Sequence, residues 1–87
     1  MSVVITANNQ VVENDNVVYA NEEDIDPDVE KEVSSSLIEV ELEETSDIEI
    51  TIDDVSSIVR AKKIKLKFPE AKRVKIKTKK KGKLRYS

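Results

Sequence analysis

Residues 37–42 read LIEVEL and residues 63–68 read KIKLKF. From Ile38 and from Ile64 onward, every second residue is apolar, and the residues between are glutamates in the first stretch and lysines in the second. A period of two is typical of a β-strand with one buried face and one solvated face. Both stretches therefore predict strands whose apolar sides form the core and whose charged sides face water.

The same alternation continues along much of the chain and predicts a mainly β protein. It recurs with Ile48, Ile50 and Ile52, and again with Val74 and Ile76. We expect a small antiparallel sheet or meander of four to five strands at about 37–44, 47–53, 62–68 and 73–79, and we leave a fifth strand at 83–86 open. Thr45-Ser46 and Pro69–Ala71 interrupt the pattern, and residues 54–59 fit either a helical turn or a continued strand.

The chain before residue 37 has a different character and divides into two parts. Residues 1–20 are rich in valine and asparagine and predict an extended or hairpin arm. Residues 21–36 form an acidic connector, in which Asp26 before Pro27 is a favourable helix start. Val29, Val33 and Leu37 follow at a spacing of four. We therefore predict one short helix near 27–35, and an antiparallel β module over 37–87.

Charge is divided between two blocks of the sequence. Residues 1–59 hold 17 acidic side chains and one basic side chain, whereas residues 60–87 hold 14 basic and one acidic. The net charges of about −16 and +13 leave a total of −3. Blocks of this kind bear on association and partner choice rather than directly on fold.

A hairpin built within either block would place like charges opposite one another, which costs a few tenths to about 1 kcal/mol for each pair. Three arrangements avoid this cost. An acidic strand can pair with a basic strand, for example 47–53 beside 62–68 in a meander; the acidic block of one copy can meet the basic block of another; or each block can face a different partner. The first is intramolecular, and we expect it.

Composition excludes several kinds of chemistry. The 87 residues include no histidine, no cysteine and one glycine, which removes histidine- or cysteine-based nucleophiles, thiolate metal sites and glycine-rich phosphate loops. Alternating carboxylates at 24–28 resemble the start of a calcium loop, but Val29 and Ser35 occupy the positions of its glycine and its final glutamate. We predict no metal, cofactor, small-molecule substrate or enzymatic activity.

The lysine-rich end of the chain is a candidate nucleic-acid-binding segment. Its residues are Lys79, Lys80, Lys81, Lys83 and Arg85. Such a segment can neutralise phosphates without reading sequence. The alternative interpretation is a solvated terminus, or an edge strand protected by lysines against aggregation. Few aromatic residues lie nearby to stack on bases.

These features favour a non-enzymatic structural or adaptor protein that is embedded in a larger protein assembly or binds copies of itself. An accessory virion component, such as a capsid-cementing or tail protein, is one example. The expected contact residues in the arm are Val3, Val4, Ile5, Val17, Val18 and Tyr19. The alternative is a nucleic-acid-binding or regulatory protein that acts through its basic end. The N-terminus predicts neither a signal peptide nor a membrane span, so an intracellular or virion location is favoured over secretion.

Overall fold

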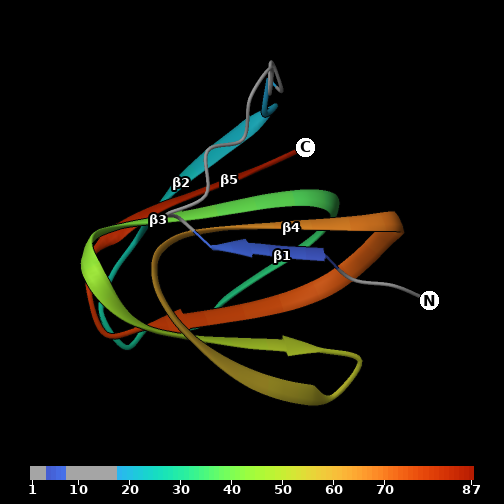
Figure 1. The fold of residues 1–87 in the computed structure, drawn as a ribbon. Helices are drawn as coiled ribbons and strands as arrows, with labels where there is room; N and C mark the ends of the chain where they lie inside the picture. The colour runs from blue at the N-terminus through green and yellow to red at the C-terminus, as the bar shows by residue number, and fades with distance from the viewer. Residues whose placement is uncertain (1–3, 8–17) are drawn as a thin grey trace.

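The computed structural model describes residues 4–7 and 18–87, which form antiparallel strands and no helix (Figure 1). The strands are β1 (Val4–Ala7), β2 (Asn21–Ile25), β3 (Lys31–Ile52), β4 (Val55–Thr78) and β5 (Gly82–Tyr86). The five strands form one hydrogen-bonded sheet in the order β1-β4-β3-β5-β2. The mainly β prediction is confirmed, including the fifth strand.

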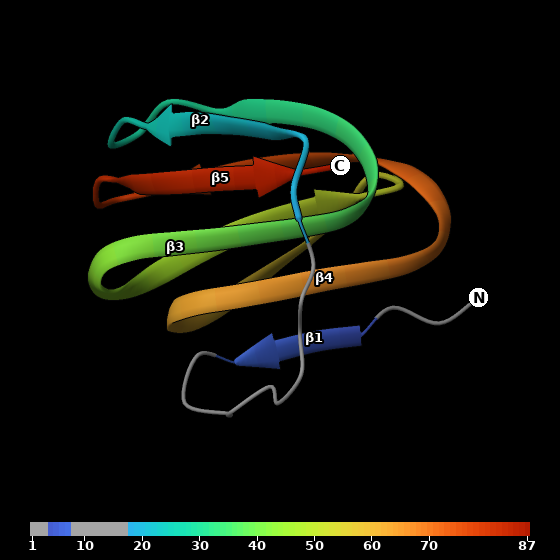
Figure 2. The ribbon, with the colours of Figure 1, turned by 90° about the horizontal axis from the view of Figure 1, so that it is seen from above.

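The two central strands are too long to remain straight. β3 has 22 residues and would span roughly 70 Å if extended, whereas the longest extent of the molecule is 29 Å. Ile48 of β3 pairs with both Val59 and Thr78 of β4, so the end of β3 lies between the two halves of β4. The sheet is therefore folded over on itself, as Figures 1 and 2 show.

The folding-over produces two layers. The first layer contains β1, residues 63–67, residues 37–42, β5 and β2, and the second contains residues 55–61, 46–52, 72–78 and 31–35. β3 and β4 each pass from one layer to the other at two corners. The two strands therefore contribute segments to both layers. The predicted strands at 37–44 and 47–53 are thus parts of β3, and those at 62–68 and 73–79 are parts of β4.

Each main corner contains a register shift of the bulge type. Residues 42–45 of β3 lie opposite the single residue Lys62 at one corner, and residues 68–71 of β4 lie opposite Ser36 at the other. Extra residues on one strand bend the pair and increase its twist. Pro69 is tolerated because it falls within such a shift, where a backbone N–H is not needed for the ladder.

The expected meander is wrong in its strand pairing. Residues 47–53 do not pair with 62–68; residues 48–52 lie between 55–59 and 74–78, and residues 37–41 pair with 63–67. In a meander, the breaks at Thr45-Ser46 and Pro69–Ala71 would be turns at which the chain reverses. They are instead corners, at which a strand passes from one layer to the other without pairing with itself.

The predicted helix near 27–35 is also wrong. Asp28 has a φ of 62° and its N–H donates a 2.8 Å hydrogen bond to the Thr78 carbonyl, so the segment that was expected to begin a helix forms a turn instead. From Lys31 the chain is extended and pairs with residues 72–76. The ladder and the burial of Val33 outweigh a helix preference that is weak in a segment with several β-branched and serine residues.

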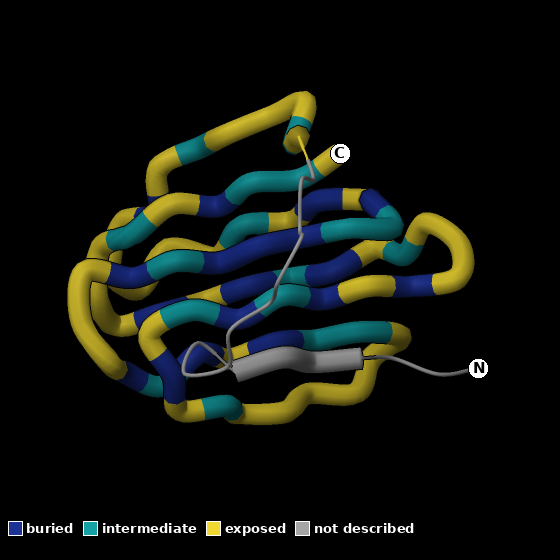
Figure 3. Tube along the Cα trace, turned by 45° about the horizontal axis from the view of Figure 1, so that its top comes forward, coloured by how far each residue is buried: buried dark blue, intermediate teal, exposed yellow. Residues whose placement is uncertain are grey.

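The core lies between the two layers and is almost entirely aliphatic. Buried and exposed positions alternate along the strands, as Figure 3 shows by colour. The buried apolar residues are Ile25, Val33, Ile38, Val40, Leu42, Ile48, Ile50, Ala61, Ile64, Leu66, Phe68, Val74, Ile76 and Leu84. Each alternating stretch contributes its apolar side to this set, so the predicted division of each strand into a buried and a charged face is confirmed.

Gly82 begins β5 at a point where the strands approach closely. A Cβ at this position would overlap the Glu41 carbonyl oxygen and would lie 2.9 Å from the Leu42 Cα. Its φ is not in the left-handed region, so glycine is required here by contact and not by backbone conformation.

We predict that Gly82→Ala destabilises the protein by about 1–3 kcal/mol, the usual cost of forcing additional atoms into a packed site. Lys81→Ala, at the exposed neighbouring position, should change the free energy of unfolding by less than about 0.5 kcal/mol. Urea unfolding monitored by far-ultraviolet circular dichroism measures both values. Equal stability of the two variants would contradict the steric argument.

Candidate protein-interaction site

The outer face of the first layer carries rows of alternating charge. β2 and β3 contribute carboxylates, and the intervening β5 and the neighbouring part of β4 contribute cations. The ladder aligns Glu22, Arg85, Glu39 and Lys65 in one row, and Asp24, Lys83, Glu41 and Lys63 in the next. Opposite charges therefore meet across every strand boundary in these rows. The expected pairing of acidic strands with basic strands is confirmed, although the partners differ from those predicted.

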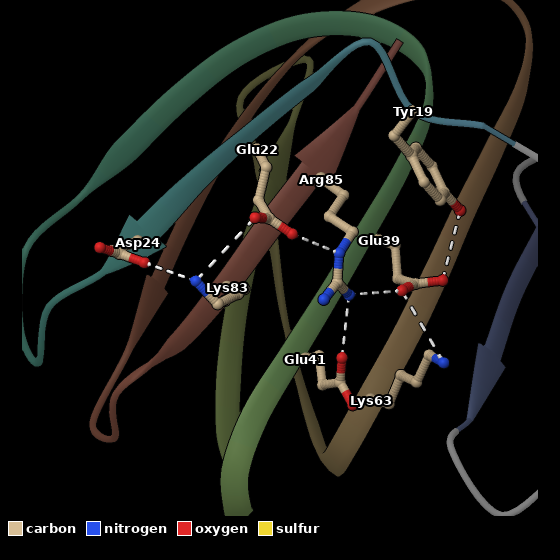
Figure 4. Close-up of polar contacts among 8 residues, drawn as sticks. All are labelled: Tyr19, Glu22, Asp24, Glu39, Glu41, Lys63, Lys83 and Arg85. Atoms are coloured by element: carbon tan, nitrogen blue, oxygen red, sulfur yellow. Dashed lines mark hydrogen bonds and ion pairs between the residues drawn. The ribbon is translucent and has the colours of Figure 1, made fainter.

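Arg85 is the centre of this network (Figure 4). Its Nε donates to Glu22 Oε2 at 2.7 Å, and its Nη1 donates to Glu41 Oε1 at 2.9 Å and to Glu39 Oε2 at 3.0 Å. The hydrogen bond to Glu41 is the main reason why the pKa of Arg85 lies above its ordinary value. The same contact lowers the pKa of Glu41. Arg85 thus ties together β2, β5 and β3.

Glu39 is the most buried carboxylate of the network, with 9% of its side chain exposed. Besides Arg85, its partners are the Lys63 ammonium at 3.8 Å and the Tyr19 hydroxyl, which donates to Oε1 at 3.3 Å. Burial, followed by the Glu39 charge, raises the pKa of Tyr19 to about 12. Tyr19 therefore remains a neutral donor across the physiological range.

The predicted arm contacts are only partly placed by the structure. Tyr19 is half-buried against Glu39, whereas Val18 is 87% exposed. Val4 and Ile5 belong to β1 and pair with Lys67 and Leu66. Val3 and Val17, with the rest of residues 1–3 and 8–17, lie outside the described residues.

Of the predicted nucleic-acid-binding residues, Lys83 and Arg85 lie in β5, whereas Lys79, Lys80 and Lys81 lie in the connection between β4 and β5. Lys80 Nζ lies 3.0 Å from Glu44 Oε1, Lys83 Nζ lies 3.0 Å from Asp24 Oδ1, and Arg85 is bound as described above. Within residues 18–87, Lys79 and Lys81 form no ion pair. β5 lies between β3 and β2, so the basic end of the chain is mainly a structural complement to the acidic strands.

We predict that Arg85→Gln lowers the free energy of unfolding by about 1–3 kcal/mol, because it removes the cation that lies 3.0 Å from the nearly buried Glu39 carboxylate. Adding Glu39→Gln should recover part of this loss, since the buried charge is then removed as well. Urea unfolding of both single variants, the double variant and the wild type gives the coupling energy. A coupling energy of zero would show that Arg85 does not stabilise Glu39.

The network also predicts a pH dependence. Hydrogen bonds from Arg85 to Glu41 and from Tyr86 to Glu23 lower the pKa values of these carboxyl groups, so the unfolded chain binds their protons more tightly than the folded chain. The resulting stability is present above the unfolded pKa of about 4.3 and is lost as the pH falls through the folded values. Urea midpoints should fall between about pH 5 and pH 3. Arg85→Gln should reduce this change, and an unaltered pH dependence in the variant would contradict the assignment.

A different feature distinguishes the border of the second layer. We call residues 55–60 the 55–60 edge, which is the olive ribbon at the bottom of Figure 1. It pairs with residues 47–52 in unbroken register, and no strand among the described residues pairs with its other side. The side chains of Val55 and Ile58 are 66% and 68% exposed. Long, regular and uncharged edges are normally avoided because they template pairing with other chains.

The opposite borders of the two layers are protected. β2 has the sequence NEEDI, so charged side chains line that edge. Lys31, on the facing border of the second layer, reaches Glu23 of β2 at 3.4 Å and connects the two edges. Inward-pointing charges of this kind discourage strand addition. Arg60 is the only charged residue of the 55–60 edge, and it is paired with Asp47 at 3.4 Å.

The turn that precedes the 55–60 edge fixes its hydrogen-bonding pattern. Asp53 and Asp54 have φ values of 52° and 65°, and Ile52 pairs with Val55 across them. Two central residues with positive φ form a type I′ hairpin turn, whose twist suits the flanking strands. Such a turn closes on a hydrogen-bonded pair, and hydrogen-bonded and non-hydrogen-bonded pairs then alternate. Residues 55, 57 and 59 therefore direct their backbone groups toward β3, whereas residues 56, 58 and 60 direct theirs to the free side.

Sequence reasoning did not identify this edge, because residues 54–59 were left undecided between a helical turn and a strand. One signal was available: residues 55–59 carry no charge in a chain that is 38% charged. The described residues include no group of His, Cys, Asp and Glu side chains arranged to hold a metal ion. They also contain no helix of the length and apolarity needed to cross a membrane. Comparisons with protein families, curated proteins and solved structures find no match to this chain.

Proposed function

We propose that this protein is a non-enzymatic structural or adaptor component that joins a larger protein assembly by strand addition at the 55–60 edge. The observation that supports this most strongly is the edge itself, which is regular, nearly uncharged and flanked by the exposed side chains of Val55 and Ile58. Strand addition obtains affinity from main-chain hydrogen bonds and specificity from alternate side chains.

The magnitudes favour a useful but modest affinity. Each main-chain hydrogen bond contributes about 0.5–1.5 kcal/mol net, and burial of the Ile58 side chain contributes a further 1.5–3 kcal/mol or so. Several such bonds offset much of the loss of translational and rotational freedom on association. A single edge therefore supports reversible docking, and an assembly that engages more than one face of the protein holds it more tightly.

The electrostatics of the charged face support the absence of catalysis. Burial lowers the pKa of Lys65 and raises that of Tyr19. The contacts within the network lower the pKa of Glu41 and raise the pKa values of Lys83 and Arg85, and these three shifts stabilise the ordinary charged forms. General acid–base catalysis needs the opposite, a pKa moved toward the working pH. These carboxylates and cations therefore act as ion pairs.

Nucleic-acid binding through the basic end has less support. A phosphate group would have to compete with Asp24 for Lys83 and with three carboxylates for Arg85. Titration of labelled single-stranded DNA at low and high salt separates the two proposals, since phosphate binding collapses steeply with salt. A virus particle, where accessory proteins attach to larger shells or tails, remains one proposed setting for the assembly.

We predict that Ile58→Lys releases the protein from its assembly and that Ile58→Thr, which keeps a β-branched residue, does not. A lysine on the edge opposes strand addition, and position 58 is exposed enough to accept either residue without unfolding. Tagged wild type and both variants, isolated under native conditions from cells that produce the protein, are compared by native mass spectrometry. Circular dichroism verifies that each variant is folded.

The wild type should occur in complexes larger than its own 9.9 kDa, and Ile58→Lys should be found mainly as a free chain. Recovery of the wild type as a free monomer would overturn the proposed function. Retention of Ile58→Lys in the same complexes would overturn the 55–60 edge as the site of docking.

A further inference from the structure

We infer that the 55–60 edge also pairs with the same edge of a second copy, to give an antiparallel dimer with its two-fold axis at Ile58. The inference rests on the proposed function, because it requires the edge to be a docking strand. It adds the identity of one partner and the register of pairing.

The backbone restricts the registers that are possible. Two strands can join only through residues whose N–H and C=O groups face the free side, and these are residues 56, 58 and 60. An antiparallel pair between identical edges that uses at least two of these residues in each copy is therefore centred on residue 57, 58 or 59. Side chains directly opposite one another then lie on the same face of the joined sheet.

The number of hydrogen bonds selects among these three registers. Centring on Ile58 pairs residue 58 with 58 and residue 56 with 60 in both directions, which gives about six main-chain hydrogen bonds. Centring on Ser57 gives about four, because residue 60 would then need Asp54, which lies in the turn with a φ of 65°. Centring on Val59 also gives about four, because residue 56 would then need Lys62 at the corner. At 0.5–1.5 kcal/mol or so for each bond, the register centred on Ile58 is favoured.

The side chains are compatible with this register. On the outer face, Ile58 meets Ile58 of the second copy, and Ser56 lies opposite Arg60. On the neighbouring strand of the same copy, Ile58 lies beside Glu49, and Glu49 in turn lies beside Lys77 of the following strand. No like charges face one another across the new boundary, so the repulsion expected between identical charged strands is absent.

The charged edge of β2 does not offer the same possibility. Self-pairing of the sequence NEEDI about its central residue would place Glu23 opposite Glu23 and Glu22 opposite Asp24. Each such contact is destabilising, and Lys83 already binds Asp24 while Arg85 binds Glu22. The 55–60 edge therefore differs from the β2 edge in being self-complementary, and its pairing joins the second layers of both copies into one continuous sheet.

Single cysteines provide the test, because the chain contains none of its own. Ile58→Cys, Ser57→Cys and Ser34→Cys are treated with a short thiol-to-thiol cross-linker, and Ser34 is the control because it is exposed on the opposite border of the same layer. Directly opposed residues lie about 5.5 Å apart between Cα atoms. We expect Ile58→Cys to form cross-linked dimer roughly tenfold faster than Ser34→Cys, owing to its high effective concentration.

Sedimentation equilibrium of the untagged wild type provides an independent measurement. A concentration-dependent dimer that is lost in Ile58→Lys supports the inference. A strictly monomeric wild type, or cross-linking of Ser57→Cys in preference to Ile58→Cys, overturns it. The dimer can fail while the proposed function stands: an isolated protein that is monomeric, but is recovered in larger complexes and is lost from them in Ile58→Lys, disproves the dimer and leaves the docking edge intact.

Discussion

The structure depends on one constraint, the burial of alternate aliphatic side chains. These side chains meet between two layers that the same two strands, β3 and β4, largely form. β3 and β4 are each more than twice as long as the molecule is wide when extended, so they fold over, and their apolar sides meet. At the corners the buried positions shift by one residue, from Val33 and Ser35 to Ile38 in β3 and from Ala61 to Ile64 in β4. Along each straight stretch the register is fixed, because a slip of one residue would turn the buried side chains outward. With one phenylalanine and no disulfide, this aliphatic contact is the main source of stability.

The charges follow from that burial. Because the apolar residues face inward, the straight stretches of β2, β3, β4 and β5 each present mainly one sign of charge outward, and the strand order alternates acidic with basic from β4 to β2. Exposed pairs such as Lys80 and Glu44 contribute little individually. The contacts of Arg85 with Glu39 matter more, because Glu39 is nearly buried and an unpaired carboxylate there would be costly. The pattern favours one strand order over others and uses most of the basic end within the fold.

The borders of the two layers differ in how well they are protected against pairing with another strand. Charges and a cross-layer ion pair protect the borders at β2 and residues 31–35. The 55–60 edge has no comparable protection in the described part of the chain, and its free backbone groups and exposed Ile58 are suited to another strand. On the charged face, the pKa shifts of Glu41, Lys83 and Arg85 stabilise the charged forms that make the ion pairs.

The sequence by itself determined the mainly β class, the core residues of the alternating stretches and the preference for acidic strands beside basic strands, because a period of two and the sign of the intervening charges are local properties. Only the tertiary structure decided that the breaks at Thr45-Ser46 and Pro69–Ala71 are corners, that residues 31–35 are strand rather than helix, and that residues 55–60 form an open edge. These depend on which segments meet after the long strands fold over. Pairing with residues 72–76 overrode the local helix signal, and an edge is defined by the absence of a neighbour, which no window of sequence contains.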